Sequence, residues 1–234
     1  NPPGHSRGME LFNPGVAVES LGPLLAGLLI TLELTVIVIL ASLVLGLLVA
    51  LARMFGPRPL AWLVLAYVEV MRDTPLLLQL IYIYYVLPEV GIRLDSFTAA
   101  VIALTLNYSA YISEVYRSGI QGIGKGQSDA AAALGMTRAL ALRRIILPQA
   151  VRLVIPALGN YLISLFKDTA LCSVVSVQEV LFSAQLIAAR NYQYFTLYTV
   201  VGVLYFIVGF AAARFVNHLE ARTRRGYRRR RRPA

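Results

Sequence analysis

The chain has 234 residues, of which 58% are hydrophobic and only 15% are charged, and its formal net charge is +10. This composition disfavours a soluble enzyme, whose surface carries more charge, and favours a bundle of membrane helices. The single cysteine, Cys172, excludes an internal disulfide and fits no metal-ligand spacing.

Three long segments are uncharged or nearly so. Between Glu19 and Arg53 only Glu33 is charged, and this stretch exceeds the ~20 residues that a helix needs to cross the hydrocarbon core of a membrane. Residues 96–113 and 191–213 carry no charged side chain. We expect one membrane-spanning helix in each of these segments.

A further apolar segment, residues 60–87, contains a group of polar breaks. Glu69, Arg72 and Asp73 lie close together within it, and Pro75 follows. Charged side chains are costly inside a membrane, and proline interrupts a helix. The segment therefore predicts a second span that is broken or that faces a polar cavity.

Two segments before the last span allow more than one interpretation. Residues 153–166 carry no charged side chain, but this stretch is shorter than a usual span. Residues 169–189 are long enough but are interrupted by Glu179. Either segment could cross the membrane, or one of them could be re-entrant.

The distribution of positive charge indicates the orientation, because basic residues that flank spans stay on the cytoplasmic side. Residues 214–232 contain nine arginines, which places the carboxyl end inside. With five spans the amino end is outside. Six spans would leave the tail inside but place residues 114–152, with six basic residues, outside. We therefore expect five spans.

A long polar segment, residues 114–149, separates the third span from the next. Ser128 can cap a first short helix, and Asp129 then lies in the first turn, where negative charge is stabilising. Gly135 is suited to end that helix. Thr137 can cap a second helix over residues 138–147.

Pro148 is expected to end this second helix. The two helices offer small residues for a close contact, with cationic residues beside them. The small residues are Ala130, Ala131 and Gly135, and the cationic residues are Arg138, Arg143 and Arg144. This face either packs on the protein's own helices or docks a partner protein, and the physical arguments favour neither.

The same segment resembles a known signature. Asp129-Ala130-Ala131, followed by Gly135 and then by Ile145, Leu147 and Pro148, resembles the "EAA" motif of permease subunits of ATP-binding-cassette (ABC) importers. The signature normally begins with Glu, so Asp129 is a departure that shortens the acidic side chain by one methylene.

The likeness extends from about residue 21 to residue 213 and points to the polar amino-acid uptake family, the histidine and glutamine permeases. The supporting motifs are Arg72 to Leu77 with Gln79, Ala110 to Glu114 with Arg117, Gly119 to Gln121, Gly126-Gln127, and Lys167 to Leu171. Ala170 stands where the family usually has Ser.

This resemblance implies an all-α membrane bundle of about five spans with the type I fold of ABC importer permeases. A permease domain is then expected over residues 21–213, with a cytoplasmic coupling loop at 118–148. A polar extension at 1–20 precedes the domain, and a basic cytoplasmic tail at 214–234, suited to lipid headgroups, follows it.

The resemblance also implies partners in a bacterial inner membrane. These are a second permease chain, identical or a sister, two ATPase subunits that hold ATP and Mg²⁺, and a periplasmic or tethered amino-acid-binding protein. Residues 126–148 would contact the ATPase. The residues expected in that contact are Asp129, Ala130, Ala131, Gly135, Arg138, Ile145, Leu147 and Pro148.

The chain is not expected to be an enzyme or to hold a cofactor or metal. Gly119, Gly124 and Lys125 imitate the spacing of a phosphate-binding loop, but Gly126 stands where that loop needs Ser or Thr, and no strand precedes it. Nucleic-acid binding is also disfavoured, because the arginine-rich tail lacks interleaved aromatic residues.

Polar residues at membrane depth are candidates for a substrate pathway. For Arg72 with Asp73 the alternative is a structural pair beside the helix break, and for Asn107, Tyr108 and Ser109 it is hydrogen bonding between helices. The candidates are Glu69, Arg72, Asp73, Thr74, Gln79, Asn107, Tyr108, Ser109 and Asp168.

Two functions of different kinds remain open on the sequence. One is the permease subunit of an ATP-driven importer of polar amino acids that works by alternating access. The other is an ion-coupled secondary carrier or channel that uses the intramembrane acids. The second lacks a detectable inverted repeat and leaves the long loop unexplained.

Overall fold

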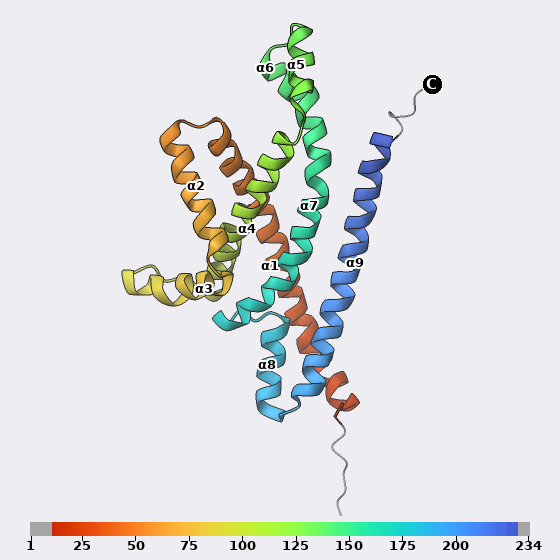
Figure 1. The fold of residues 1–234 in the computed structure, drawn as a ribbon. Helices are drawn as coiled ribbons and strands as arrows, with labels where there is room; N and C mark the ends of the chain where they lie inside the picture. Colours follow the sequence, from red (N-terminus) through yellow and green to blue (C-terminus); the bar gives the residue numbers. More distant parts are fainter. Residues whose placement is uncertain (1–10, 229–234) are drawn as a thin grey trace, which may run out of the picture.

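The computed structural model describes residues 11–228, with side chains described as far as residue 222. Within these residues all the regular secondary structure is helical, with no strand. Residues 1–10 of the expected extension and residues 229–234 of the expected tail lie outside the described part. Figure 1 shows long helices side by side, with a hairpin at one end of the bundle.

The first helix, α1, runs from Pro14 to Phe55 and so begins within the segment expected as a polar extension. Asn13 caps it, because its side-chain oxygen accepts hydrogen bonds from Gly15 N at 3.0 Å and Val16 N at 3.3 Å. The helix packs most extensively against α4, Ser96–Gln121. Thus the first and third expected spans form the centre of the fold.

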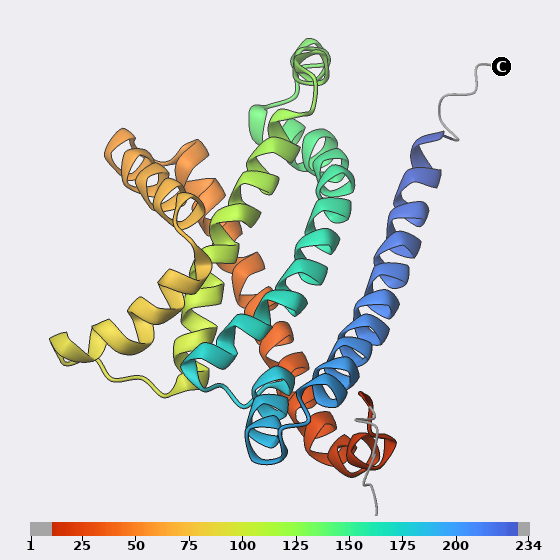
Figure 2. The ribbon, with the colours of Figure 1, turned by 60° about the horizontal axis from the view of Figure 1, so that its bottom comes forward.

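The second expected span is broken, as predicted. Helix α2, Arg58–Asp73, ends at Thr74, whose φ of −107° and ψ of 144° are extended, as the residue before a proline favours. After Pro75 the chain continues through α3 (Leu76–Ile81), the π-helical η1 (Tyr82–Val86) and the 3₁₀-helical η2 (Leu87–Val90). Figures 1 and 2 both show this arm directed away from the bundle.

Helix α4 begins at an acidic cap. The Asp95 carboxylate accepts a hydrogen bond from Thr98 N at 3.0 Å. Hydrogen bonding from the Thr98 side chain, and then from this backbone N–H, lowers the pKa of Asp95 below its ordinary value. The helix then passes between α1 and α7, contacting both. It leads from the interior of the bundle into the first helix of the hairpin described next.

The hairpin consists of α5 (Lys125–Ala133) and α6 (Arg138–Ala141), as two short helices were predicted. Gly135 joins them with a φ of +73°, and Thr137 caps α6. The expected cap at Ser128 is wrong. Helix α5 starts one turn earlier, directly after Gly124, because residues 125–127 contain no proline or capping competitor that would exclude a helical turn.

Pro148 does not end the second helix. Instead, the π-helical η3 (Leu142–Ile146) follows α6 and leads into α7 (Leu147–Asp168), with Pro148 in the first turn of α7. In η3 the Leu147 N–H bonds the carbonyl of Leu142, five residues back. This shift of the hydrogen-bond register accommodates a residue that has no N–H to donate.

The segment after α7 forms only short helices. The 3₁₀-helical η4 (Thr169–Val175) leads to α8 (Val180–Asn191), whose 12 residues span about 18 Å against a hydrocarbon core of about 30 Å. Of the two ambiguous segments, the first therefore belongs to the long helix α7. The second forms η4 and the short α8, which continues to the end of the bundle where α9 begins (Figure 1).

Three described segments are long and apolar enough to cross a membrane by length and composition: Pro14–Phe55, Arg138–Val175 and Tyr194–Arg222, the last within α9 (Tyr194–Arg228). Helices α4 and α2 are not among them, because polar residues lower the hydropathy of α4 and α2 has only 16 residues. Both nevertheless run along the bundle (Figure 1), so α1, α2, α4, α7 and α9 match the five spans expected.

The buried core has two main parts. One lies between α1, α4, α7 and η4 and includes Leu34, Leu104 and Leu165, which are fully buried. The other joins α1 to α8 and α9. There the fully buried Glu179 caps α8 by accepting bonds from Leu181 N and Phe182 N, at 2.9 and 2.6 Å.

Candidate functional site

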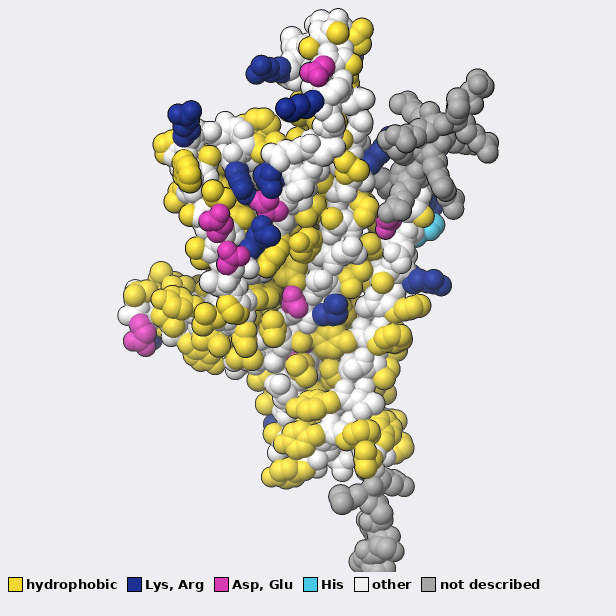
Figure 3. Space-filling view, in the orientation of Figure 1, with side chains coloured by type: hydrophobic (Ala, Val, Ile, Leu, Met, Phe, Trp, Pro, Cys, Tyr) yellow, Lys and Arg dark blue, Asp and Glu magenta, His cyan; other side chains and the backbone are white. Residues whose placement is uncertain are grey.

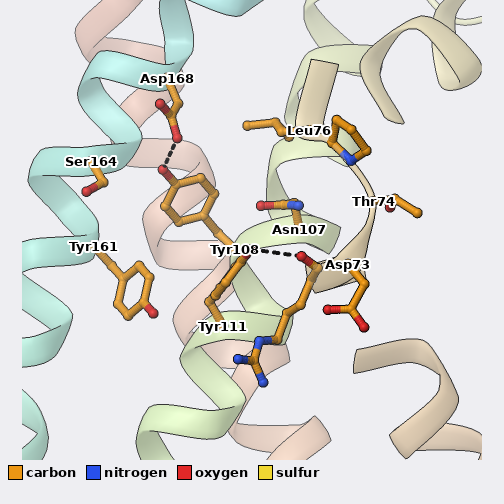
Figure 4. Close-up of a pocket in the computed structure, with 11 residues that line it drawn as sticks. Asp73, Thr74, Leu76, Asn107, Tyr108, Tyr111, Tyr161, Ser164 and Asp168 are labelled. Atoms are coloured by element: carbon orange, nitrogen blue, oxygen red, sulfur yellow. Dashed lines mark hydrogen bonds between the residues drawn. The ribbon is translucent and has the colours of Figure 1, made fainter. Parts of the chain in front are cut away.

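A polar pocket lies where the broken second span meets α4 and α7. Its volume is about 420 Å³. Figure 4 shows the side chains that line it. The lining residues are Arg72, Asp73, Thr74, Pro75, Leu76, Asn107, Tyr108, Tyr111, Tyr161, Ser164 and Asp168. Three segments that are far apart in the sequence thus form one cavity of a size usual for small-molecule sites.

The break at Pro75 supplies part of the pocket wall and is held by amide side chains. Gln79 Nε2 donates to the carbonyls of Met71 and Thr74, at 3.0 and 3.2 Å, and to Thr74 Oγ1 at 2.7 Å. Asn107 Nδ2 donates to the Met71 carbonyl at 2.9 Å and to Gln79 Oε1 at 3.1 Å. These bonds satisfy backbone carbonyls that the end of α2 would otherwise leave unpaired.

On the opposite wall a cluster of tyrosine rings surrounds Tyr108, which hydrogen-bonds the Asp168 carboxylate. The Tyr108 hydroxyl donates a 2.6 Å hydrogen bond to Asp168 Oδ2 (Figure 4). The ring of Tyr161 meets that of Tyr108 edge to face at 6.3 Å and lies 5.9 Å from the ring of Tyr111. Because Tyr108 is 3% exposed, this bond fixes the Asp168 carboxylate at the pocket surface.

A cationic side chain, that of Arg72, also lines the pocket. The Arg72 guanidinium carbon lies 5.5 Å from the centre of the Tyr111 ring, within cation–π range. The Tyr111 hydroxyl donates to the Arg72 carbonyl at 3.2 Å. With Arg72 on one side and the carboxylates of Asp73 and Asp168 around the cavity, the site can bind a carboxylate and an ammonium group together.

The structure brings six of the nine candidate pathway residues to the pocket: Arg72, Asp73, Thr74, Asn107, Tyr108 and Asp168. Glu69 is exposed on α2 and does not line it. Gln79 lies behind the lining and supports it. Ser109 points to α2, where its hydroxyl shares a 2.7 Å hydrogen bond with Tyr67, so it makes the interhelical bond that was the alternative interpretation.

Sequence reasoning missed three polar lining residues, Tyr111, Tyr161 and Ser164. Helical periodicity could have found them. Ser164 and Tyr161 precede Asp168 by four and seven residues, which places all three on one face of α7. Tyr111 follows Tyr108 by one turn of α4.

The hairpin carries the residues expected in the ATPase contact, and its surface is largely exposed (Figure 3). Asp129, Ala130, Gly135 and Arg138 are exposed, whereas Ala131 is buried within the hairpin itself. Neighbouring helical residues point about 100° apart, so the small-residue face is divided between self-packing and an open surface.

The remaining residues expected in the ATPase contact lie beyond the hairpin, in η3 and the first turn of α7. Ile145 is half-buried, and Leu147 and Pro148 are exposed. Leu134, at the tip, is 79% exposed, an unusual position for a large apolar side chain in a charged region. Such a residue is suited to insertion into a groove of another protein.

Long apolar helices around a pocket with charges of both signs define a helical membrane protein built to pass a polar solute. The comparisons with known proteins agree. Residues 42–225 match the family described as "Binding-protein-dependent transport system inner membrane component".

Two curated relatives and one solved structure illustrate the likeness. The probable amino-acid ABC transporter permease protein y4tG of Sinorhizobium fredii is 42% identical over 86% of this chain and 87% of that protein. The probable glutamine ABC transporter permease protein GlnM of Bacillus subtilis is 38% identical over 92% of this chain and 100% of its own length.

The solved structure is a crystal structure of an amino acid ABC transporter with histidines. It superposes with a TM-score of 0.87 at 37% identity, covering 90% of this chain and 98% of that one. The chain belongs to the family of binding-protein-dependent transport system inner membrane components, and the resemblance to ABC importer permeases is confirmed.

Proposed function

We propose that this chain is the permease subunit of an ATP-driven importer of polar amino acids. The proposal rests on the family and on relatives named as amino-acid permeases. The single observation that supports it most is the pocket, where Arg72, Asp73 and Asp168 line one cavity among long apolar helices.

The pocket is the proposed substrate site. Charged side chains at membrane depth are costly and are kept where they serve a pathway. An amino acid carries one carboxylate and one ammonium group, which Arg72 and Asp168 can pair with respectively. Tyr108 keeps Asp168 oriented, and the tyrosine rings supply apolar contact for a side chain.

The hairpin formed by α5 and α6 is the proposed contact with a separate ATPase subunit, which holds ATP and Mg²⁺. The exposed Asp129, Arg138 and Leu134 offer an acid, a base and an apolar anchor for that contact. A second permease chain, identical or a sister, and an amino-acid-binding protein outside the membrane complete the proposed importer.

The amino end is proposed to lie outside and the carboxyl end inside the bacterial inner membrane. The hairpin and the end of α9 lie at one end of the bundle, opposite the start of α1 and α8 (Figure 1). Charged side chains gather over the hairpin half of the molecule (Figure 3), as cytoplasmic flanks require. Alternating access would then expose the pocket to each side in turn.

The pocket assignment is tested with the complete complex in liposomes, by ATP-dependent uptake of a panel of labelled amino acids. We expect Asp168→Asn to lower uptake about tenfold or more, because it removes a charge paired with the substrate ammonium group. Glu69→Gln is the matched control, since Glu69 is acidic and near but outside the lining. Equal uptake by Asp168→Asn and the control would contradict the assignment.

A further inference from the structure

An ion-pair network joins the end of α1 to α4 outside the pocket. Arg53, in the last turn of α1, donates from Nη1 to Glu114 Oε1 of α4. Arg117, one turn further along α4, donates to Glu114 Oε2 from Nε at 2.9 Å and from Nη2 at 2.6 Å. One carboxylate therefore holds two guanidinium groups from two helices.

The network continues toward the hairpin. Arg117 Nη1 donates to Gln121 Oε1 at 2.5 Å, and Gln121 is the last residue of α4. Helix α5 begins at Lys125, four residues later. The bonds thus extend from α1 along α4 to the base of the proposed ATPase contact.

In the other direction the same helix reaches the pocket. Tyr111, which lines the pocket and bonds the Arg72 carbonyl, lies three residues before Glu114 and on the same side of α4. Helix α1 ends at Phe55, and α2, which carries Arg72, begins at Arg58. The Arg53–Glu114 pair therefore ties α4 to the short connection that leads into the α2 wall of the pocket.

The network is not needed to keep α1 and α4 together. Their packing is already close further along, where a Cβ on Gly46 would lie 2.8 Å from Ile112 Cγ2. The side chain of Glu114 is 17% exposed and that of Arg53 is 25% exposed, so solvent screens their attraction less than that of a surface pair. The pair therefore resists separation of the two helix ends.

We propose that Glu114 is a positioning residue which, held by Arg53 and Arg117, makes the ends of α1 and α4 move as one unit. A displacement of the hairpin by the ATPase then reaches both the α4 wall and the α2 wall of the pocket. This inference rests on the proposed function. Without the pair, α4 would follow the ATPase while α1 and α2 lagged behind, and ATP would be hydrolysed without transport.

The test compares ATP hydrolysed per amino acid transported in liposomes that contain the complete complex. We expect Arg53→Gln to raise this ratio about tenfold, within the usual range for coupling between distant sites. Arg53→Lys, which keeps the charge, should restore most of the coupling. Arg58→Gln is the control, because Arg58 is exposed on the same connection and, within the described residues, has no ion-pair partner.

If Arg53→Gln leaves the ATP hydrolysed per amino acid transported unchanged, the inference is overturned. This holds whether the rates of ATP hydrolysis and of transport both stay high or both fall. Loss of assembly of Arg53→Gln with the ATPase would overturn it as well, because the network would then serve folding. If the unmodified complex shows no ATP-dependent uptake, the proposed function fails instead. The two failures are thus distinguishable.

Discussion

Two residues, Tyr108 and Asp168, set the chemistry of the pocket. The Tyr108 hydroxyl donates a 2.6 Å hydrogen bond to the Asp168 carboxylate. This bond fixes the orientation of the carboxylate and so the direction of its remaining lone pairs. The pair comes from two helices, α4 and α7, so the same bond that orients the site also fixes their relative position. Local chemistry and packing are linked at this point.

We predict that Tyr108→Phe raises the KM for amino-acid uptake about tenfold and leaves the assembly of the complex intact. The substitution keeps the ring but removes a hydrogen bond to a charged group, worth about 1.5–3 kcal/mol. Tyr161→Phe is the matched control, since the Tyr161 ring packs in the same cluster without a hydrogen bond from its hydroxyl among the described contacts. An equal KM for both variants would contradict the role of the Tyr108 hydroxyl.

At the scale of the elements, backbone breaks position the functional parts. The break before Pro75 ends α2 at the pocket, and the left-handed Gly135 turns the hairpin. In that turn Met136 N bonds the Ala131 carbonyl at 3.0 Å and Gly135 N bonds the Ala132 carbonyl at 2.9 Å, a Schellman pattern. A residue with a branched Cβ is strained at this φ.

Replacing Gly135 with valine should therefore disturb the hairpin and abolish stable binding of the ATPase, while the binding protein still binds amino acid. Co-purification of the ATPase with the tagged permease measures this directly. Gly126→Ala is a suitable control, because Gly126 lies in α5 with nothing within 4 Å of an added Cβ. If the Gly135→Val permease copurifies with as much ATPase as the unmodified permease, the proposal that the hairpin contacts the ATPase is contradicted.

The sequence was sufficient for the elements whose signals are local. Proline after Asp73-Thr74 predicted the break of the second span, and Gly135 predicted the turn. It was insufficient at Pro148, because a π-helical turn absorbs the missing N–H and such turns leave no simple sequence pattern.

The pocket depended on contacts between helices that are distant in the sequence. Asn107, Tyr108 and Asp168 were candidates because they are polar at membrane depth. Tyr161 was not a candidate, because an aromatic residue in a membrane helix is usually core. Its position became clear only when α7 was placed against α4.

At the scale of the whole molecule, the bundle has a chemically distinct end. The hairpin and the end of α9 lie at the same end of the bundle (Figure 1), and charged side chains gather over that half of the molecule (Figure 3). The opposite end carries aromatic residues between α8 and α9, including the exposed Tyr192, Tyr194 and Phe195. Aromatic side chains of this kind favour the boundary between membrane and water.

This polarity predicts the reactivity of single introduced cysteines toward a membrane-impermeant maleimide. Tyr192→Cys should react in intact spheroplasts, and Leu134→Cys only in inside-out vesicles. The two parent residues are 78% and 79% exposed, and the native Cys172 is buried and provides a silent background. The reverse pattern would contradict the proposed orientation.

The central claim, that this chain carries amino acids by using ATP hydrolysed in a partner, is tested most directly by reconstituted uptake. The chain would be purified from its native membrane with whatever copurifies and placed in liposomes that enclose ATP, and labelled amino acids and the binding protein would be added outside. We predict accumulation that requires the copurified ATPase and ATP on its side of the membrane. Accumulation by the chain alone, driven by an ion gradient and indifferent to ATP, would contradict the claim and favour a secondary carrier.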